Sequence, residues 1–210
     1  MKIVFATGNK GKFKEAREIL GPGYELLCPA DLGISDDIDE NGTTLKENSI
    51  IKARYIHEKT GLDCFADDTG LEVDALGGLP GIHAARFAEM MGHAGASHDF
   101  QANRDVLLAE LAKHPGEPRT ARFRCVVTLI LGNKEYYFDG CLEGMISEKE
   151  SGTRGFGYDP VFIANEFPGR TLAEIRIEDK DAVSHRGKSL RAMAEFLQNQ
   201  YICVNEEKEK

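Results

Sequence analysis

Hydrophobic and polar positions along the first sixty residues predict strands and helices in alternation. The apolar run Lys2–Ala6 ends in a Thr-Gly-Asn turn and predicts a strand, and Tyr24–Cys28 predicts a second. Between them, apolar residues on one face predict a helix over Lys12–Leu20. A capping box, Thr44-x-x-Glu47, predicts the start of a helix that runs to about residue 60.

Farther along the chain, the same patterns predict more strands and two more helices. Asp63–Ala66 and Leu71–Val73 are predicted strands, separated by an Asp-Asp-Thr-Gly turn. Other predicted elements are a helix from Asp99 to about Lys113, strands at Ala121–Leu131, Glu135–Gly144 and Val161–Ala164, and a helix from Ser184 to about Gln200. This order predicts an α/β fold with a mixed sheet. We expect one domain over 1–203 and a disordered charged tail over 204–210.

Composition excludes some classes of protein. The chain has 210 residues, 41% of them hydrophobic, with 26 basic and 35 acidic residues and a net charge of −9. Such a balance argues against a surface that coats nucleic acid, which would be basic, but a local lysine cluster can still bind phosphate. No apolar run reaches about 18 residues, so no membrane partner is expected. We also expect no signal peptide at the start of the chain.

The five cysteines predict no disulfide framework and no zinc site. Their number is odd, their spacings are long and no Cys-x-x-Cys occurs. Four of them sit among apolar or strand-like neighbours, which is typical of buried thiols in a reducing compartment. We therefore expect a cytoplasmic protein.

A possible phosphate site lies between the first strand and the first helix. Its sequence is Thr7-Gly8-Asn9-Lys10-Gly11-Lys12. Glycines let backbone N–H groups approach a phosphate, the helix start adds a favourable dipole, and two lysines add charge. The spacing is not that of a P-loop, and an ordinary turn with solvated lysines remains an equal alternative.

Acidic residues suggest a metal site. Asp67 and Asp68 precede Thr69-Gly70 at the predicted end of a strand, where ligands gather in α/β sheets. Magnesium prefers one or two carboxylates together with substrate phosphates. An acidic loop over residues 29–42, including Asp37 and Glu40, could complete the site, and Asn48 shares a helix face with Lys52. A capped surface turn and a solvated loop are the alternatives.

Two later segments could bind a base. Gly155-Phe156-Gly157-Tyr158-Asp159-Pro160 places glycines around an aromatic ring that could stack on a base. Ser184-His185-Arg186-Gly187-Lys188 places donors at a predicted helix start. Taken alone, the first is more often a rigid turn with a core ring and the second a set of surface residues.

In combination, these segments resemble the inosine triphosphate pyrophosphatase family, whose members remove non-standard purine nucleoside triphosphates from the nucleotide pool. The resemblance extends from Met1 to about Leu197. The matching segments are Ala6–Lys12, Glu47-Asn48, Lys52–Arg54, Ala66–Leu76, Pro80–Ile82, Gly155–Pro160 and Ser184–Gly187. One departure is Thr69, where the family more often has serine, and the hydroxyl is kept. Glu89–Ser97 and the tail match nothing in the family pattern.

The resemblance implies an elongated mixed sheet with flanking helices, two lobes around a central cleft, and a homodimer. It also implies Mg²⁺-dependent hydrolysis of ITP, dITP and XTP to the monophosphate and pyrophosphate. Asp68 would be the proton acceptor, supported by Asp67 and Lys12, and Glu40 and Asp68 would hold the metal ion. The implied substrate-binding residues are Thr7, Gly8, Asn9, Lys10, Gly11, Lys12, Lys52 and Thr69, with Phe156, Gly157, Tyr158, Asp159, Lys180, His185 and Arg186 around the base.

Two other functions are compatible with parts of this sequence. A pyrimidine triphosphate pyrophosphatase of the related septum-inhibitor group would catalyse the same class of reaction, but Gly155–Pro160 and Ser184–Gly187 argue against it. A nucleotide sensor without catalytic activity is the second, and the acidic pair at Asp67 and Asp68 argues against it, because binding alone does not need that pair.

Overall fold

The structure is a computed structural model that describes residues 1–36, 38–93 and 98–208, with the backbone alone for 201–208. Asp37 of the acidic loop, residues 94–97 of the unmatched stretch and the last two residues of the tail lie outside the described residues.

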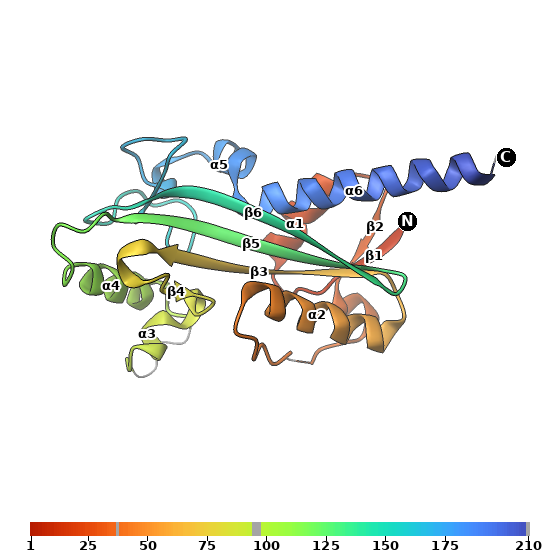
Figure 1. Cartoon of the computed structure of the whole chain (residues 1–210), viewed down its shortest axis with the longest axis horizontal. Coiled ribbons are helices and arrows are strands. Elements are labelled where there is room, and N and C mark those ends of the chain that lie inside the picture. The colour runs from red at the N-terminus through yellow and green to blue at the C-terminus, as the bar shows by residue number, and fades with distance from the viewer. Residues whose placement is uncertain (37, 94–97, 209–210) are drawn as a thin grey trace. The chain divides into compact units, whose positions relative to one another are not determined.

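The described residues form a mixed sheet with flanking helices (Figure 1). The strands are β1 Lys2–Phe5, β2 Glu25–Leu27, β3 Cys64–Val73, β4 Pro80–Gly81, β5 Thr120–Leu131, β6 Lys134–Ile146 and β7 Phe162–Ala164. The helices are α1 Lys10–Leu20, α2 Leu45–Thr60, α3 Phe87–Met90, α4 Phe100–Leu111, α5 Ile177–Val183 and α6 His185–Lys208. Strand order is β2-β1-β3-β5-β6-β7, with β4 paired to β3. β1 is parallel to β2 and β3, whereas β4 is antiparallel to β3, so the predicted mixed α/β fold is confirmed.

The chain groups into two compact units. Unit 1 comprises Met1–Asp68, Cys125–Gly140 and Arg186–Lys210, and unit 2 comprises Thr69–Arg124 and Cys141–His185. In chain order, β3, β5 and β6 therefore each contribute residues to both units.

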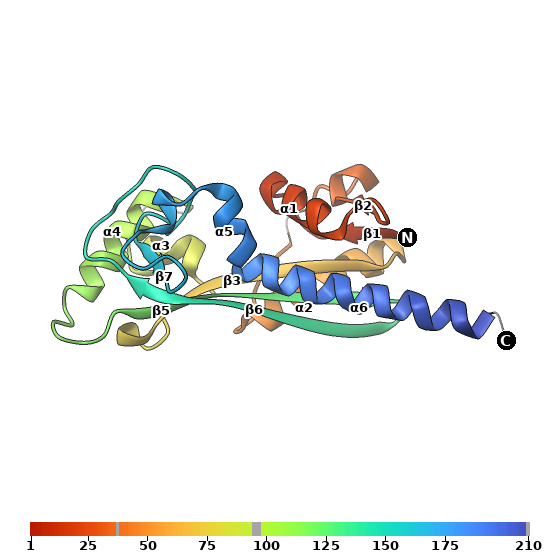
Figure 2. The same ribbon diagram turned by 90° about the horizontal axis from the view of Figure 1, so that it is seen from above.

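Unit 1 has a hydrophobic core on each face of its strands, because neighbouring strand residues point to opposite faces. Ile3, Phe5 and Phe65 pack with residues of α1 and α6, whereas Val4 and Ala66 pack with residues of α2. Figure 2 shows α6 in front of the strands of the sheet, and Figure 1 shows α2 below β3. Side chains on β3 in this unit thus alternate between two faces: one face packs against α1 and α6, and the other packs against α2.

Unit 2 has one apolar core and one charged strand face. Leu71 and Val73 of β3 pack in the core with Phe123 of β5 and residues of α3 and α4. The alternate positions are charged, and they form ion pairs among Glu72, Asp74, Arg122, Arg124 and Glu143. This alternation is typical of a sheet with one buried and one solvated face.

The predicted break between two strands at Asp67–Gly70 is wrong, because β3 continues without interruption from Cys64 to Val73. A strand can accept this acidic pair because cationic side chains meet the carboxylates on both of its faces. Most other predicted elements are present within a few residues of their expected bounds, but α3, α5 and β4 were not predicted. Helix α6 extends to Lys208, past the expected end near residue 200, and the domain boundary at 203 stays a prediction.

The sequence predicted neither a membrane-spanning segment nor a disulfide framework. None of the helices that the described residues form is both long enough and apolar enough to pass through a membrane. Of the four cysteines whose side chains are described, none forms a disulfide.

The stacked rings of Phe5 and Phe65 provide a test of the unit 1 core. Their centroids lie 4.4 Å apart at an interplanar angle of 16°, and both side chains are fully buried. We expect Phe5→Ala to lower the free energy of unfolding by about 3–5 kcal/mol, because the cavity it leaves is apolar. Urea denaturation measures this, with Ile177→Ala as the control at a position that is 58% exposed. Equal stability of the two variants would contradict the assignment of this core.

Candidate functional site

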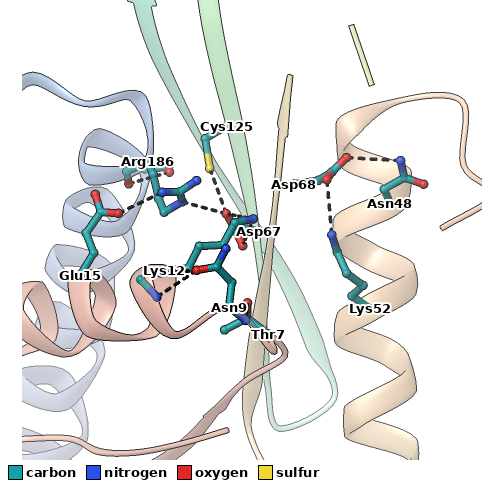
Figure 3. Close-up of polar contacts among 12 residues, drawn as sticks. Thr7, Asn9, Lys12, Glu15, Asn48, Lys52, Asp67, Asp68, Cys125 and Arg186 are labelled. Carbon is teal, nitrogen blue, oxygen red and sulfur yellow. Dashed lines mark hydrogen bonds and ion pairs between the residues drawn. The ribbon is translucent and has the colours of Figure 1, made fainter. Parts of the chain in front are cut away.

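Asp67 and Asp68 lie side by side in β3, and their side chains point to opposite faces of the strand (Figure 3). Asp67 has the orientation of Phe65 and faces α1 and α6, and Asp68 has the orientation of Ala66 and faces α2. The two carboxylates therefore have separate partners, and they do not form a pair of adjacent ligands for one ion.

Asp67 lies in a buried network of alternating charges. It is 2% exposed, and Lys12 Nζ of α1 lies 3.0 Å from its Oδ1 and 2.9 Å from its Oδ2. Arg186 Nε, at the start of α6, donates to Asp67 Oδ2 at 3.0 Å, and Arg186 Nη1 donates to Glu15 Oε2 at 3.0 Å. Cys125 Sγ of β5 approaches the same Oδ2 at 3.9 Å. Both oxygens of Asp67 are thus engaged by cationic groups (Figure 3).

These cations determine the protonation state of Asp67. Burial by itself would raise the pKa of Asp67, but the charges of Lys12, Arg186 and Lys52 outweigh burial and hold the pKa well below its usual range. The same contact raises the pKa of Arg186 against the effect of its own burial. A carboxylate that is permanently ionised and bound by two cations is a weak base, so Asp67 is suited to holding Lys12 and Arg186 in place.

Asp68 has weaker hydrogen-bond partners on the opposite face. Asn48 Nδ2 of α2 donates to Asp68 Oδ2 at 3.3 Å, and Lys52 Nζ donates to Asp68 Oδ1 at 3.3 Å. Lys52 Nζ also donates to Glu40 Oε2 at 2.6 Å, so one ammonium group joins two carboxylates. This small group contains Glu40 and Asp68, the two metal ligands that the family resemblance implied, whereas Asp67 lies on the other face of β3.

The pKa of Asp68 shifts in the direction opposite to that of Asp67. Burial raises the pKa of Asp68, and the negative charge of Glu40 adds to this effect, while Lys52 and Lys12 oppose it. Lys52 itself has a raised pKa, because Asp68, Asp67 and Glu40 together outweigh the cost of its burial. Of the two neighbouring carboxylates, Asp68 is therefore the stronger base.

The first turns of α2 hold Asn48 and Lys52 in place. Thr44 Oγ1 accepts from the N–H of Glu47 at 3.1 Å, which is the N-cap half of the predicted capping box. Glu47 Oε2 accepts from the backbone N–H of Thr43 at 2.6 Å, one residue before the N-cap. Asn48 Oδ1 accepts from the N–H of Gly42 at 2.8 Å, so the amide nitrogen of this side chain is directed at Asp68. The cap thus links the loop that carries Glu40 to the helix that carries Lys52.

The proposed phosphate segment has a tightly bonded backbone. Asn9 is the N-cap of α1, and its Oδ1 accepts from the N–H groups of Gly11 at 2.9 Å and Lys12 at 3.1 Å. Thr7 Oγ1 accepts from the N–H of Asn9 at 3.1 Å. Three of the backbone donors that the sequence offered to a phosphate are therefore occupied within the turn. The exposed side chain of Lys10 and the half-buried Lys12 supply the charge of this segment.

A second group of predicted residues lies in unit 2. Phe156 is 57% exposed, and its backbone N–H donates to Asp159 Oδ2 at 2.9 Å. Lys180 Nζ donates to the same oxygen at 2.6 Å and lies 5.2 Å from the centroid of the Phe156 ring. Tyr158 is buried, and its hydroxyl donates to the carbonyl of Ala84 at 2.8 Å, so it supports the loop from beneath.

The remaining predicted residues have different surroundings. The ring of His185 stacks on Phe123, with centroids 4.9 Å apart. Among the described residues, nothing hydrogen-bonds the buried hydroxyl oxygen Thr69 Oγ1. Arg186, expected around the base with His185, instead has its guanidinium on Asp67 and Glu15. Its contact with a base stays a prediction, as does a common cleft for the two groups.

Sequence reasoning missed Glu15 and Arg104. Glu15 lies three residues after Lys12 on α1, so helical spacing could have placed the two on one side, but its partner Arg186 is 171 positions away. Arg104 of α4 donates to the carbonyl of Gly157 at 2.8 Å and carried no motif of its own. Contacts between distant segments of this kind have no local signal.

Known proteins are similar to this chain over nearly its whole length. The model of the Ham1 family matches residues 3–196. A dITP/XTP pyrophosphatase of Christiangramia forsetii is 44% identical over 197 residues, covering 94% of this chain and 99% of the relative. One of Bacillus subtilis is 40% identical over 199 residues, covering 94% and 97%.

Solved structures agree with the sequence comparison. A HAM1 protein from Coxiella burnetii matches with a TM-score of 0.86 and 33% identity, covering 95% of this chain and 99% of that one. The Ham1 protein of Staphylococcus aureus matches with a TM-score of 0.84 and 32% identity, covering 95% and 100%. The resemblance inferred from the motifs is confirmed, since sequence and fold agree from the first strand to the last helix: this chain belongs to the Ham1 family.

Proposed function

We propose that this protein is a pyrophosphatase that hydrolyses non-standard purine nucleoside triphosphates, namely ITP, dITP and XTP, to the monophosphate and pyrophosphate. Membership of the Ham1 family and full-length relatives named dITP/XTP pyrophosphatase support this assignment. The observation in the chain itself that carries it is the convergence of Glu40 and Asp68 on the single ammonium group of Lys52. A cytoplasmic location, a homodimer and the absence of a nucleic-acid partner stay predictions from the sequence.

The donor set of this group fits Mg²⁺. Two carboxylates already meet at one cation, and the described residues hold no group of three or more His, Cys, Asp or Glu side chains that could bind a metal. Magnesium is usually held by one or two carboxylates, with substrate phosphates and water completing its shell. We propose that Glu40 and Asp68 hold Mg²⁺, which would acidify a water molecule and neutralise charge on the departing pyrophosphate.

Asp68 is the proposed proton acceptor. Its burial and the nearby Glu40 raise its pKa, which makes it a better base than an exposed aspartate. Asn48 and Lys52 each contact one of its oxygens, and these contacts orient the carboxylate without fully neutralising it. Hydrolysis would require a water attack on the α-phosphorus, with the proton passing to Asp68 as pyrophosphate leaves.

Lys12 and Lys52 are the proposed triphosphate contacts. An ammonium group has three N–H donors, and Asp67 engages Lys12 through two short contacts, so a further donor can serve a phosphate. Because the turn amides of Gly11 and Lys12 are bonded to Asn9, the lysine side chains would supply most of the charge that stabilises the phosphate oxygens.

Base recognition is assigned to the group in unit 2. The exposed ring of Phe156 offers a face for stacking a purine, and His185 and Lys180 carry hydrogen-bond donors. The 6-keto oxygen of hypoxanthine and xanthine accepts a hydrogen bond where adenine offers a donor. A donor at that point would therefore favour ITP and XTP over ATP.

The first test of this function is the identity of the products. We expect ITP incubated with Mg²⁺ to give IMP and pyrophosphate directly, because cleavage is assigned to the α–β linkage. Phosphorus NMR of the reaction distinguishes pyrophosphate from orthophosphate. Appearance of IDP and orthophosphate as first products would overturn the proposal, and binding of ITP without turnover would favour the sensor alternative.

The second test compares the two aspartates. We expect Asp68→Asn to lower kcat by about 10²-fold or more with little change in stability, because it removes the proton acceptor. Asp67→Asn should instead destabilise the fold by about 3–5 kcal/mol, because it removes the counter-charge of half-buried Lys12 and leaves buried Arg186 with Glu15 alone. Steady-state kinetics at saturating Mg²⁺ and thermal unfolding separate the two effects. Near-normal turnover in Asp68→Asn would refute its role.

The third test concerns Lys12. We expect Lys12→Ala to weaken binding of a non-hydrolysable ITP analogue about tenfold and to reduce the salt dependence of binding, because one charged phosphate contact is lost. Calorimetry at two salt concentrations measures both. Lys14→Ala is the matched control, since Lys14 lies on the same helix and its exposed ammonium pairs with Glu18. Unchanged affinity in Lys12→Ala would contradict a phosphate contact, and the role of Lys12 would then be limited to its ion pair with Asp67.

A further inference from the structure

The exposed ring of Phe156 is carried by a loop that is fixed on both sides of the ring. On one side, the N–H of Phe156 itself donates to Asp159 Oδ2 at 2.9 Å. On the other, the carbonyl of Gly157 accepts from Arg104 Nη1 at 2.8 Å. Gly157 has a φ of +61°, a conformation that favours glycine, so this carbonyl has a direction that other residues adopt only with strain. The orientation of the ring therefore depends on two anchors, of which only the first lies within the loop.

Arg104 is itself held firmly. Its side chain is 12% exposed, and its Nε donates to Glu150 Oε1 at 2.9 Å. Its Nη2 donates to Gln101 Oε1 at 2.5 Å, and Gln101 Nε2 donates to the same Glu150 oxygen at 2.7 Å. Hydrogen bonding from Arg104 lowers the pKa of Glu150, so the carboxylate remains charged. All three guanidinium nitrogens thus have a partner, and a planar group bound at three points holds a carbonyl in one position.

Helix α4 also supplies an aromatic neighbour for the loop. Phe100, four residues before Arg104 and hence on the same side of the helix, is 44% exposed. Its ring centroid lies 6.2 Å from that of Phe156, with an interplanar angle of 48°. The start of α4 therefore contacts both the ring and the backbone that carries it.

We propose that Arg104 is a positioning residue for base recognition, which holds the Gly157 carbonyl and so keeps the Phe156 ring oriented for stacking on a purine. This inference rests on the proposed function, since it assumes that Phe156 stacks on the base. An exposed ring on a loose loop would lose conformational freedom each time a nucleotide bound, and a ring that is already fixed avoids that cost. Arg104 makes its contribution through Gly157 and has no part in the proton transfer at Asp68.

Kinetics of two substitutions test the effect on binding. We expect Arg104→Gln to raise KM for ITP about fivefold to tenfold, while kcat stays within about twofold. The rise in KM corresponds to losing part of the binding free energy that one stacked base contributes. Arg104→Lys keeps one charge near Glu150 but not the planar group, so an intermediate KM is expected. Lys113→Gln, just beyond the end of the same helix, is the control, because exposed Lys113 forms its ion pair with Glu110, three residues earlier in the chain. An unchanged KM in Arg104→Gln would overturn the proposal, and so would a fall in kcat as large as the rise in KM.

A fluorescence measurement tests the positioning directly and needs no nucleotide. The chain contains no tryptophan, so Phe156→Trp introduces a single reporter on the loop. We expect its steady-state anisotropy to fall when Arg104→Gln is added and to change less with Arg104→Lys, at unfolding temperatures that show all variants to be folded. Equal anisotropy would overturn the proposal even if KM rises, since Arg104 would then act by another route. Failure of the unaltered protein to release pyrophosphate from ITP would refute the function and leave the anisotropy comparison as the test of positioning.

Discussion

A buried carboxylate in the middle of a strand imposes the main constraint on the site. Asp67 is almost completely excluded from solvent, and an isolated charge in that position would be very unfavourable. Lys12 from α1 and Arg186 from α6 compensate for it, and Glu15 balances Arg186 in turn. These charges bring together β3 and the starts of two helices that are far apart in the sequence. The starts of α1 and α6 are thereby tied to one point on β3.

The alternation of strand side chains gives the neighbouring aspartate a different chemistry. Asp68 shares a backbone with Asp67 but faces α2, where an amide and a shared ammonium group leave its charge only partly compensated. The two pKa values consequently move in opposite directions, one lowered by cations and the other raised by burial and Glu40. Separate environments for adjacent carboxylates allow one to organise the helices while the other is available for proton transfer.

Sequence reasoning predicted the elements and the family but not the contacts between distant segments. The helices at Lys12–Leu20 and after Thr44 have local periodicity and caps, and both are present. The acidic pair looked like a turn because Asp-Asp-Thr-Gly has turn composition, and only the cations from α1, α2 and α6 explain why a strand continues through it. Arg186 looked like a base contact because its motif opens a helix, yet its guanidinium lies on Asp67 and Glu15. No local pattern could have revealed these partners, since they depend on which segments the fold brings together.

The uninterrupted pairing of β3 has a consequence for how this region can vary. Side chains on a strand repeat every two residues, so one added or deleted residue reverses the face of everything beyond it. An insertion between Ala66 and Asp67 would turn the first carboxylate towards α2 and the second towards α1 and α6, exchanging their surroundings without altering either residue. Natural variation at this point should therefore take the form of substitutions, with length changes confined to the loops. The number of residues along β3 decides which helices each aspartate faces, and so which role it can have.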